Sequence, residues 1–217
     1  MRHIFILNPS AGREDRTPML RGDILAAAER CNIKPEIVVT KYKGYATKFV
    51  KETLYETGEL CRFYACGGDG TINEVVNGAA GHTNAQLACY PCGTGNDFVK
   101  IFDNRDAFLN FDRLIKGDTM PVDVIDAGGY RSINIFSTGI DARVAHWVCK
   151  NKRKVPVGGK VPYDDALLIT FFRRLDRYYE VEIDGKRYDD DYYIIVAASG
   201  RYYGGGYYAV PEAEPVD

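Results

Sequence analysis

The chain has 217 residues with 28 basic and 30 acidic side chains, a formal net charge of −2, and 46% hydrophobic residues. This composition is typical of a folded globular protein with a sizeable core, and it provides no general basic field for binding nucleic acid. The first apolar run is too short for a signal peptide, and no later window approaches the roughly 20 apolar residues of a membrane span. We therefore expect a cytoplasmic protein that binds no nucleic acid and has no transmembrane segment.

Short apolar strands alternate with amphipathic helices through the first half of the chain. The pattern predicts strands over 4–7, 36–40, 61–66 and 86–91. It predicts helices from residue 17, around 46–54, over 71–80, from residue 96 onward and near 105–116. This alternation predicts the α/β class, with a doubly wound parallel sheet covered by helices on both faces.

The pattern changes near Pro121. Two predicted strands meet at Gly128-Gly129, and two more flank an Asp184-Gly185 turn. Helices are predicted between these pairs of strands, over 140–150 and 163–174.

These elements divide the chain into two predicted domains. We expect an α/β domain over 1–121 and a mainly antiparallel β-sandwich domain over 122–217. A sandwich usually has about seven strands in about 100 residues. The second part offers fewer, so we expect a truncated sandwich.

The six cysteines include the spacing Cys89-Tyr-Pro-Cys92, which suits a redox pair or half of a zinc site. No second pair with matching spacing follows, and Cys89 falls inside an apolar run. Buried thiols on a strand are the better interpretation.

Glycine-rich segments follow the predicted strands, where ligands of parallel α/β sheets bind. Glycine there allows either a tight turn or close approach of a ligand to the backbone. The segment GGDGT at 67–71 opens a helix, whose free amides and positive dipole end favour a phosphate. Asp69 beside phosphates is explained by a divalent cation between them, or by a role in accepting a proton.

A plain tight turn, with Asp69 capping the next helix, is the alternative for this one segment. The segments NPSAG at 8–12 and PCGTGND at 91–97 repeat the same ingredients at neighbouring strand ends. Three such loops at one edge of a sheet favour phosphate binding. Their spacing matches neither the Walker A motif nor the dinucleotide-binding fingerprint.

Four segments together resemble the catalytic domain of diacylglycerol kinases, in particular the soluble bacterial lipid kinases of that family, which are related to sphingosine kinases. These segments are NPSAG at 8–12, Thr40, GGDGTINE at 67–74 and PCGTGNDF at 91–98. The second half agrees, because NIFSTGIDARV at 134–144 and the 18 residues at 200–217 are similar to second-domain motifs of the family.

The resemblance implies transfer of the γ-phosphoryl group of ATP, with Mg²⁺, to a lipid hydroxyl, most often that of diacylglycerol. It implies a cleft between the two domains and a lipid substrate at the membrane surface, where the protein would be peripheral. Asp69 would act near the transferred phosphate, whereas Asn96 and Asp97 would fix their loop. The nucleotide would be lined by Asn8, Pro9, Ser10, Ala11, Gly12, Thr40, Gly67, Gly68, Asp69, Gly70, Thr71, Ile72, Asn73 and Thr94.

Family members continue well past Asp217, which would be the first residue of a metal-binding segment. We therefore expect a truncated chain whose activity is poor or absent. Two other functions stay open: a kinase with a soluble acceptor, similar to NAD kinases, and a nucleotide-binding protein without catalysis. A homodimer also stays open.

Overall fold

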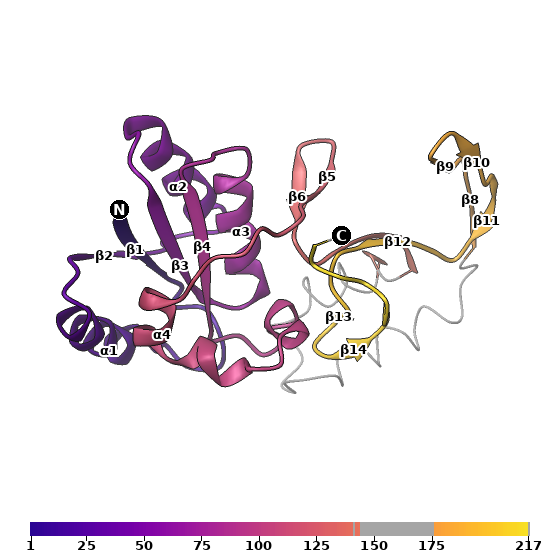
Figure 1. Cartoon of the computed structure of the whole chain (residues 1–217). Coiled ribbons are helices and arrows are strands. Elements are labelled where there is room, and N and C mark those ends of the chain that lie inside the picture. The colour runs from indigo at the N-terminus through magenta and orange to yellow at the C-terminus, as the bar shows by residue number, and fades with distance from the viewer. Residues whose placement is uncertain (141, 144–175, 217) are drawn as a thin grey trace. The chain divides into compact units, whose positions relative to one another are not determined.

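The computed structural model describes residues 1–140, 142–143 and 176–216 (Figure 1). The chain packs as two units, one of Met1–Asn134 with Ser199–Asp217 and one of Ile135–Ala198. The helices predicted over 140–150 and 163–174 lie outside the described residues, apart from Ile140, Ala142 and Arg143. The predicted domain boundary between 121 and 122 stays a prediction.

The first unit is built on a sheet of four parallel strands in the order β2-β1-β3-β4. The strands are β1 (Arg2–Leu7), β2 (Pro35–Val39), β3 (Cys61–Gly67) and β4 (Ala85–Pro91). Every residue of β3 is buried, as are the last five of β1. The two inner strands are therefore covered on both faces, which is why their sequences are almost continuous apolar runs.

Helices pack on both faces of this sheet. They are α1 (Thr17–Arg30), α2 (Tyr45–Glu56), α3 (Asp69–Ala79) and α4 (Phe111–Lys116). On one face α2 and α3 bury Val50 and Val75 against Ile4, Ile6 and other inward residues of the sheet. On the other face α1 and α4 complete a second core. The members of that core include Phe5, Leu7, Leu20, Ile24, Tyr64, Tyr90 and Phe111. The predicted doubly wound α/β arrangement is confirmed.

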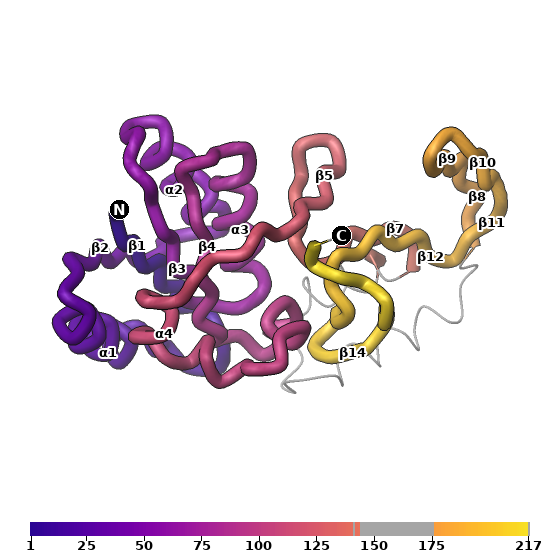
Figure 2. Tube along the Cα trace, viewed as in Figure 1, coloured from indigo at the N-terminus to yellow at the C-terminus, as the bar shows by residue number. Residues whose placement is uncertain are grey.

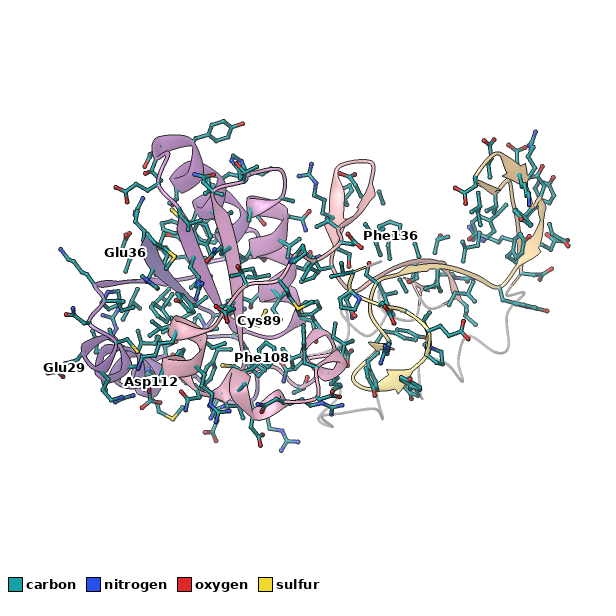
Figure 3. The ribbon with its side chains drawn as sticks, in the orientation of Figure 1. Glu29, Glu36, Cys89, Phe108, Asp112 and Phe136 are labelled. Carbon is teal, nitrogen blue, oxygen red and sulfur yellow. The ribbon has the colours of Figure 1, made fainter. Side chains whose placement is uncertain are left out.

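The two helices of the second core are also joined at the surface. Arg30 at the end of α1 donates from Nη2 to Oδ2 of Asp112 on α4 at 2.7 Å, and from Nε to Oδ1 at 3.1 Å. Asp112 is labelled in Figure 3. This two-point contact lowers the pKa of Asp112, chiefly through the hydrogen bond from Arg30.

The predicted helices after β4 are shorter than expected. The helix expected from residue 96 is one 3₁₀ turn, η1 (Phe98–Ile101), and the region 105–116 divides into η2 (Arg105–Leu109) and α4. Asn110 causes this division, because its backbone is extended and its side chain accepts a hydrogen bond from the amide of Arg113. An asparagine in this position ends one helical segment and caps the next.

A buried polar pair lies at the start of the sheet. Nδ1 of His3 lies 2.6 Å from the hydroxyl oxygen of Tyr64. Burial, and then the charge of Arg62, lower the pKa of His3. Burial raises the pKa of Tyr64 to about 12. Both groups are therefore neutral near pH 7.

Short antiparallel hairpins complete the first unit. Strand β5 (Ile125–Ala127) pairs with β6 (Tyr130–Ser132), and β13 (Tyr202–Tyr203) pairs with β14 (Tyr207–Tyr208). Gly128 and Gly129 have φ values of 64° and 89° between β5 and β6. The left-handed conformation favours glycine there, so the predicted hairpin is confirmed.

The second unit contains only antiparallel pairs among its described residues, and Figure 2 traces its path. Strand β7 (Ile135–Gly139) pairs with β12 (Ile194–Ala198), and β8 (Arg177–Tyr179) pairs with β11 (Asp190–Tyr192). The innermost pair, β9 (Glu182–Ile183) and β10 (Lys186–Arg187), encloses the predicted turn at Asp184-Gly185. The expectation of antiparallel strands in the second part of the chain is confirmed.

Candidate functional site

The order of the strands places a candidate site at the carboxyl ends of β1 and β3. The chain leaves β1 for β2 on one side and then crosses to β3 on the other side. Open α/β sheets bind ligands beside such a reversal of strand order. Asn8, which follows β1, donates from its amide to the carbonyl oxygen of Cys66 at 3.1 Å and from Nδ2 to Oγ1 of Thr71 at 2.9 Å. The loop after β1 and the start of α3 are therefore joined.

The glycine loops at this edge lie in direct contact. A Cβ on Gly12, whose φ is +80°, would lie 2.6 Å from the carbonyl oxygen of Cys92. A Cβ on Gly93 would lie 2.5 Å from the Cα atom of Gly68. These glycines are required by the packing of one loop on another. The three segments that the sequence singled out after β1, β3 and β4 thus meet in space.

Gly70 differs from these glycines. It lies exposed in the first turn of α3, and a Cβ there would have no atom within 4 Å. Glycine inside a helix costs about 1 kcal/mol relative to alanine. The packing of the first unit gives no reason for this glycine. The first amides of a helix have no partner within it, so the backbone at Gly70 is open to an anion that approaches closely.

Asp69 connects the start of α3 to the loop after β4. Its Oδ1 atom accepts a hydrogen bond from the amide of Asp97 at 2.6 Å. Burial raises the pKa of Asp69, and the negative charge of Asp97 raises it further. The carboxyl group is therefore more basic than an exposed aspartate, which suits a group that accepts a proton.

Asp97 holds two other segments in place. Its Oδ1 atom accepts from Nζ of Lys100 at 2.6 Å, and its Oδ2 atom accepts from the amide of Gly205 at 2.8 Å. Asp97 is only 5% exposed. Asn96 closes the loop itself, with its side chain bonded to both the amide and the carbonyl group of Gly93. These contacts agree with the expectation that Asn96 and Asp97 fix the loop.

Lys100 and Gly205 were not predicted as members of the site. Lys100 lies three residues after Asp97, a spacing at which side chains on a helical turn meet. This ion pair could therefore have been predicted from the sequence. Gly205 lies in a run of three glycines, each with positive φ. The run signals a tight turn, but not which part of the protein the turn contacts.

Four other predicted nucleotide residues have clear roles in the packing of the first unit. Ser10 and Ala11 shape the loop after β1, because their amides bond to Asn8. Ile72 is buried in the core. Asn73 donates from Nδ2 to the carbonyl oxygen of Arg131 at 2.9 Å, so its side chain holds the hairpin β5–β6 against α3. Asp217 lies outside the described residues.

The cysteines near the site are buried and unpaired. Cys89 (Figure 3) lies on β4, and its burial, together with the charge of Asp69, raises its pKa to about 12. Burial raises the pKa of Cys66 and of Cys92 as well. Thiols with raised pKa values stay protonated at neutral pH and are poor nucleophiles. This agrees with their interpretation as buried thiols.

The described residues include no group of three or more His, Cys, Asp or Glu side chains that could hold a metal ion. Asp69 supplies the carboxylate in the first turn of α3, with its Oδ1 atom bonded to the amide of Asp97. Mg²⁺ is commonly held by one or two carboxylates together with substrate phosphates and water. Asp69 would therefore be the residue that holds a magnesium ion arriving with phosphates.

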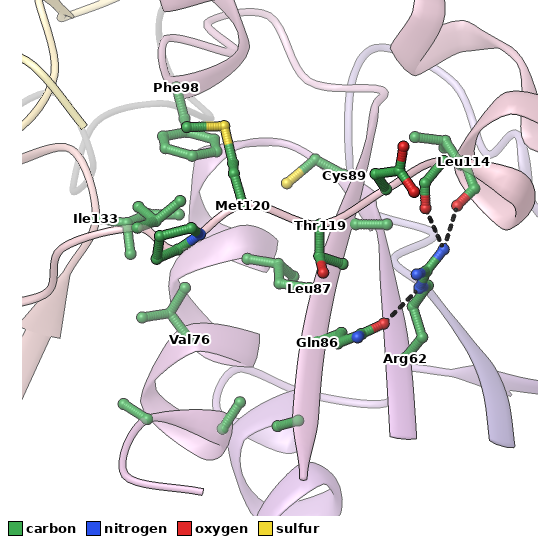
Figure 4. A pocket seen from close by; sticks show the side chains of 18 of the residues that line it. Arg62, Val76, Gln86, Leu87, Cys89, Phe98, Leu114, Thr119, Met120 and Ile133 are labelled. Carbon is green, nitrogen blue, oxygen red and sulfur yellow. Dashed lines mark hydrogen bonds between the residues drawn. The ribbon is translucent and has the colours of Figure 1, made fainter. Parts of the chain in front are cut away.

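A separate cavity of about 720 Å³ lies beside β4 (Figure 4). Leu87, Phe98 and Met120 line it, and Arg62 is at its wall. Arg62 donates to the carbonyl oxygens of Leu114, Ile115 and Gly117 and to Gln86. These bonds cap the end of α4, so the guanidinium is used for structure.

Two family models match the chain. One is described as the diacylglycerol kinase catalytic domain and matches residues 2–127. The other is described as the YegS C-terminal NAD kinase beta sandwich-like domain and matches residues 134–217. No helix among the described residues is long and apolar enough to cross a membrane.

The chain is also similar to named relatives. It is 32% identical to a diacylglycerol kinase from Bacillus subtilis over 83% of this chain and 59% of the relative. It is 32% identical to one from Staphylococcus carnosus over 65% of this chain and 46% of the relative. The chain thus spans about half the length of these curated relatives. A crystal structure of a diacylglycerol kinase from Bacillus anthracis superposes with a TM-score of 0.71 at 26% identity, covering 99% of this chain and 69% of that one.

The fold and the glycine loops define a protein with an α/β domain followed by an antiparallel β-sandwich-like region, as the sequence predicts. The chain belongs to the diacylglycerol kinase family. The resemblance seen in the sequence is confirmed.

Proposed function

We propose that this chain carries the nucleotide site of an ATP-dependent lipid kinase that transfers the γ-phosphoryl group to a lipid hydroxyl, with diacylglycerol as the substrate. The observation that supports this most directly is Gly70, a helical glycine that the packing of the fold does not require. Its position in the first turn of α3 suits close contact between phosphate oxygens and backbone amides.

We assign the following roles to the residues of the site. The loop 8–12 and the first turn of α3 would bind and orient the phosphates, with Thr40 and Thr94 at the sides. Asp69 would contact magnesium or accept the proton of the acceptor hydroxyl. Bound magnesium supplies neutralisation of charge on the phosphoryl oxygens. Phosphoryl transfer depends mainly on such positioning and neutralisation.

The lipid acceptor is proposed from the relatives, which are named diacylglycerol kinases. A peripheral location at the cytoplasmic membrane surface follows from such a substrate. We also propose a homodimer, a metal-binding role for Asp217 and a domain boundary between residues 121 and 122. The second candidate is a kinase with a soluble acceptor, which stays open because the YegS C-terminal model that matches 134–217 is described as NAD kinase beta sandwich-like.

Transfer of label from γ-labelled ATP tests these functions. We expect the label in lipid when diacylglycerol micelles are supplied, at the low level expected of a truncated chain, and none in NAD. Label in NAD would favour the soluble acceptor. ATP binding without transfer to either would favour a nucleotide-binding protein without catalysis.

A further inference from the structure

The loop after β2 places an exposed aromatic ring at the same edge of the sheet as the glycine loops. The loop begins beside the end of β1, because the amide of Thr40 donates to the carbonyl oxygen of Leu7 at 2.9 Å. Tyr42 follows two residues later and is 57% exposed. Lys41 and Lys43 on either side of it are exposed as well. The chain therefore presents a basic, aromatic segment close to the candidate phosphate site.

The Tyr42 ring has fixed neighbours. It meets the ring of Tyr45 edge-on, with centroids 5.2 Å apart and planes at 84°. Tyr45 is in turn parallel to Phe49, at 6.5 Å and 5°, and Nζ of Lys41 lies 5.9 Å from the Tyr45 ring centroid. Tyr42 thus combines a supported ring with a largely open surface. Rigid aromatic side chains of this kind bind at low conformational cost.

The loop is also tied to the helix that begins with the GGDGT segment. Glu74 on α3 accepts a hydrogen bond from the amide of Gly44 at 2.8 Å and one from the amide of Ala46 at 3.1 Å. The hydroxyl group of Thr47 donates to the carbonyl oxygen of Glu74 at 2.8 Å. These three bonds fix the position of the Tyr42 loop relative to the start of α3.

The two sides of the start of α3 differ in how closely their loops pack. On the β4 side, Gly93 packs against Gly68, and a Cβ on Gly95 would meet both Asp69 and Gly205. On the β2 side, the space beside Gly44 is open. Strands β2 and β3 are separated by β1, so their ends lie about 10 Å apart. That span matches the extent of a nucleotide from its phosphates to its base.

We propose that Tyr42 is the stacking platform for the base of the bound nucleotide, with Lys41 and Lys43 beside the sugar and phosphates. The inference rests on the proposed function, because it takes the phosphates to lie at the start of α3. Every base has a π-face, so such a platform adds affinity and does not distinguish adenine from guanine. Removal of one stacked ring typically weakens binding by about tenfold.

Calorimetry on the full chain tests the platform by comparing ATP with inorganic tripolyphosphate, both with magnesium. We expect Y42A to weaken ATP binding about tenfold and to leave tripolyphosphate binding unchanged, while Y42F keeps both affinities. Y55A is the matched control, because Tyr55 lies on α2 with 82% exposure. We expect Y55A to bind both ligands as the original chain does.

Each of the following outcomes would overturn the inference. Unchanged ATP binding by Y42A would show that no base stacks there. Equal losses for ATP and tripolyphosphate would show that Tyr42 acts through the shape of the loop. Unchanged ATP binding with reduced binding of Y42A to anionic phosphatidylglycerol vesicles would assign the segment to a membrane surface. If the original chain binds neither ligand, the proposed nucleotide site fails together with its platform.

Discussion

The substitution Gly70→Ala tests whether glycine at this position is needed for folding or for ligand binding. Gly70 is exposed in the first turn of α3, and the position of an added methyl group is free of other atoms within 4 Å. Replacing glycine by alanine in an exposed helix stabilises it by roughly 0.5–1 kcal/mol. For a chain of this size we expect an increase in Tm of about 1–4 °C.

The same substitution should damage binding. If phosphate oxygens contact the amides at the start of α3, the methyl group of G70A lies between them and the backbone. We expect the affinity for MgADP to fall at least tenfold, a loss of about 1.4 kcal/mol. A variant that gains stability and loses affinity would show that the glycine serves the ligand, because a damaged fold would lose both.

Gly22→Ala provides the matched control. Gly22 is an exposed residue of α1, and a Cβ there would also have no atom within 4 Å. We expect G22A to raise Tm by a similar amount and to bind MgADP like the original chain. Thermal unfolding gives the Tm of the two variants, and calorimetry gives their affinities for MgADP. Equal MgADP affinity for G70A and G22A would show that Gly70 is not needed for nucleotide binding.

Three further predictions concern hydrogen-bonded polar side chains of the first unit. Asp69→Asn should keep the fold, because an amide oxygen can accept the same hydrogen bond from the amide of Asp97. It should reduce phosphoryl transfer at least 100-fold. Retained transfer by a folded variant would contradict the role of Asp69. The lowered pKa of His3 means that the unfolded chain binds more protons there, so the free energy of unfolding should fall as pH decreases below the ordinary value of 6.5. Denaturant titrations from pH 8 to pH 5 measure this slope, and His3→Gln should flatten it. Glu74→Ala removes the acceptor for two amides at the start of α2, and should lower the free energy of unfolding by about 1–3 kcal/mol; an unchanged midpoint in denaturant would count against that contact.

The sheet and its helices could be predicted because periodicity and burial agree in them. The run IFIL at 4–7 reads as a strand covered on both faces, and all four of its residues are fully buried. The segments after β4 were harder, because their boundaries depend on single residues. Asn110 ends one helical turn and caps the next, whereas periodicity alone predicts one helix over 105–116.

The location of the candidate site could be predicted, but not the role of each of its glycines. Gly93 and Gly70 stand in similar motifs, yet only Gly93 is required by a neighbouring loop. That difference depends on which loops are in contact, and the motifs in the sequence do not show those contacts. The bond from Gly205 to Asp97 joins residues 108 positions apart, so no local pattern indicates it.

The most direct test of the account is a crystal structure of the chain with magnesium and a non-hydrolysable analogue of ATP. We expect the triphosphate against the backbone of Gly68, Gly70 and the loop 8–12, with Asp69 beside the metal. A triphosphate bound elsewhere, for example in the cavity lined by Leu87 and Met120, would contradict it.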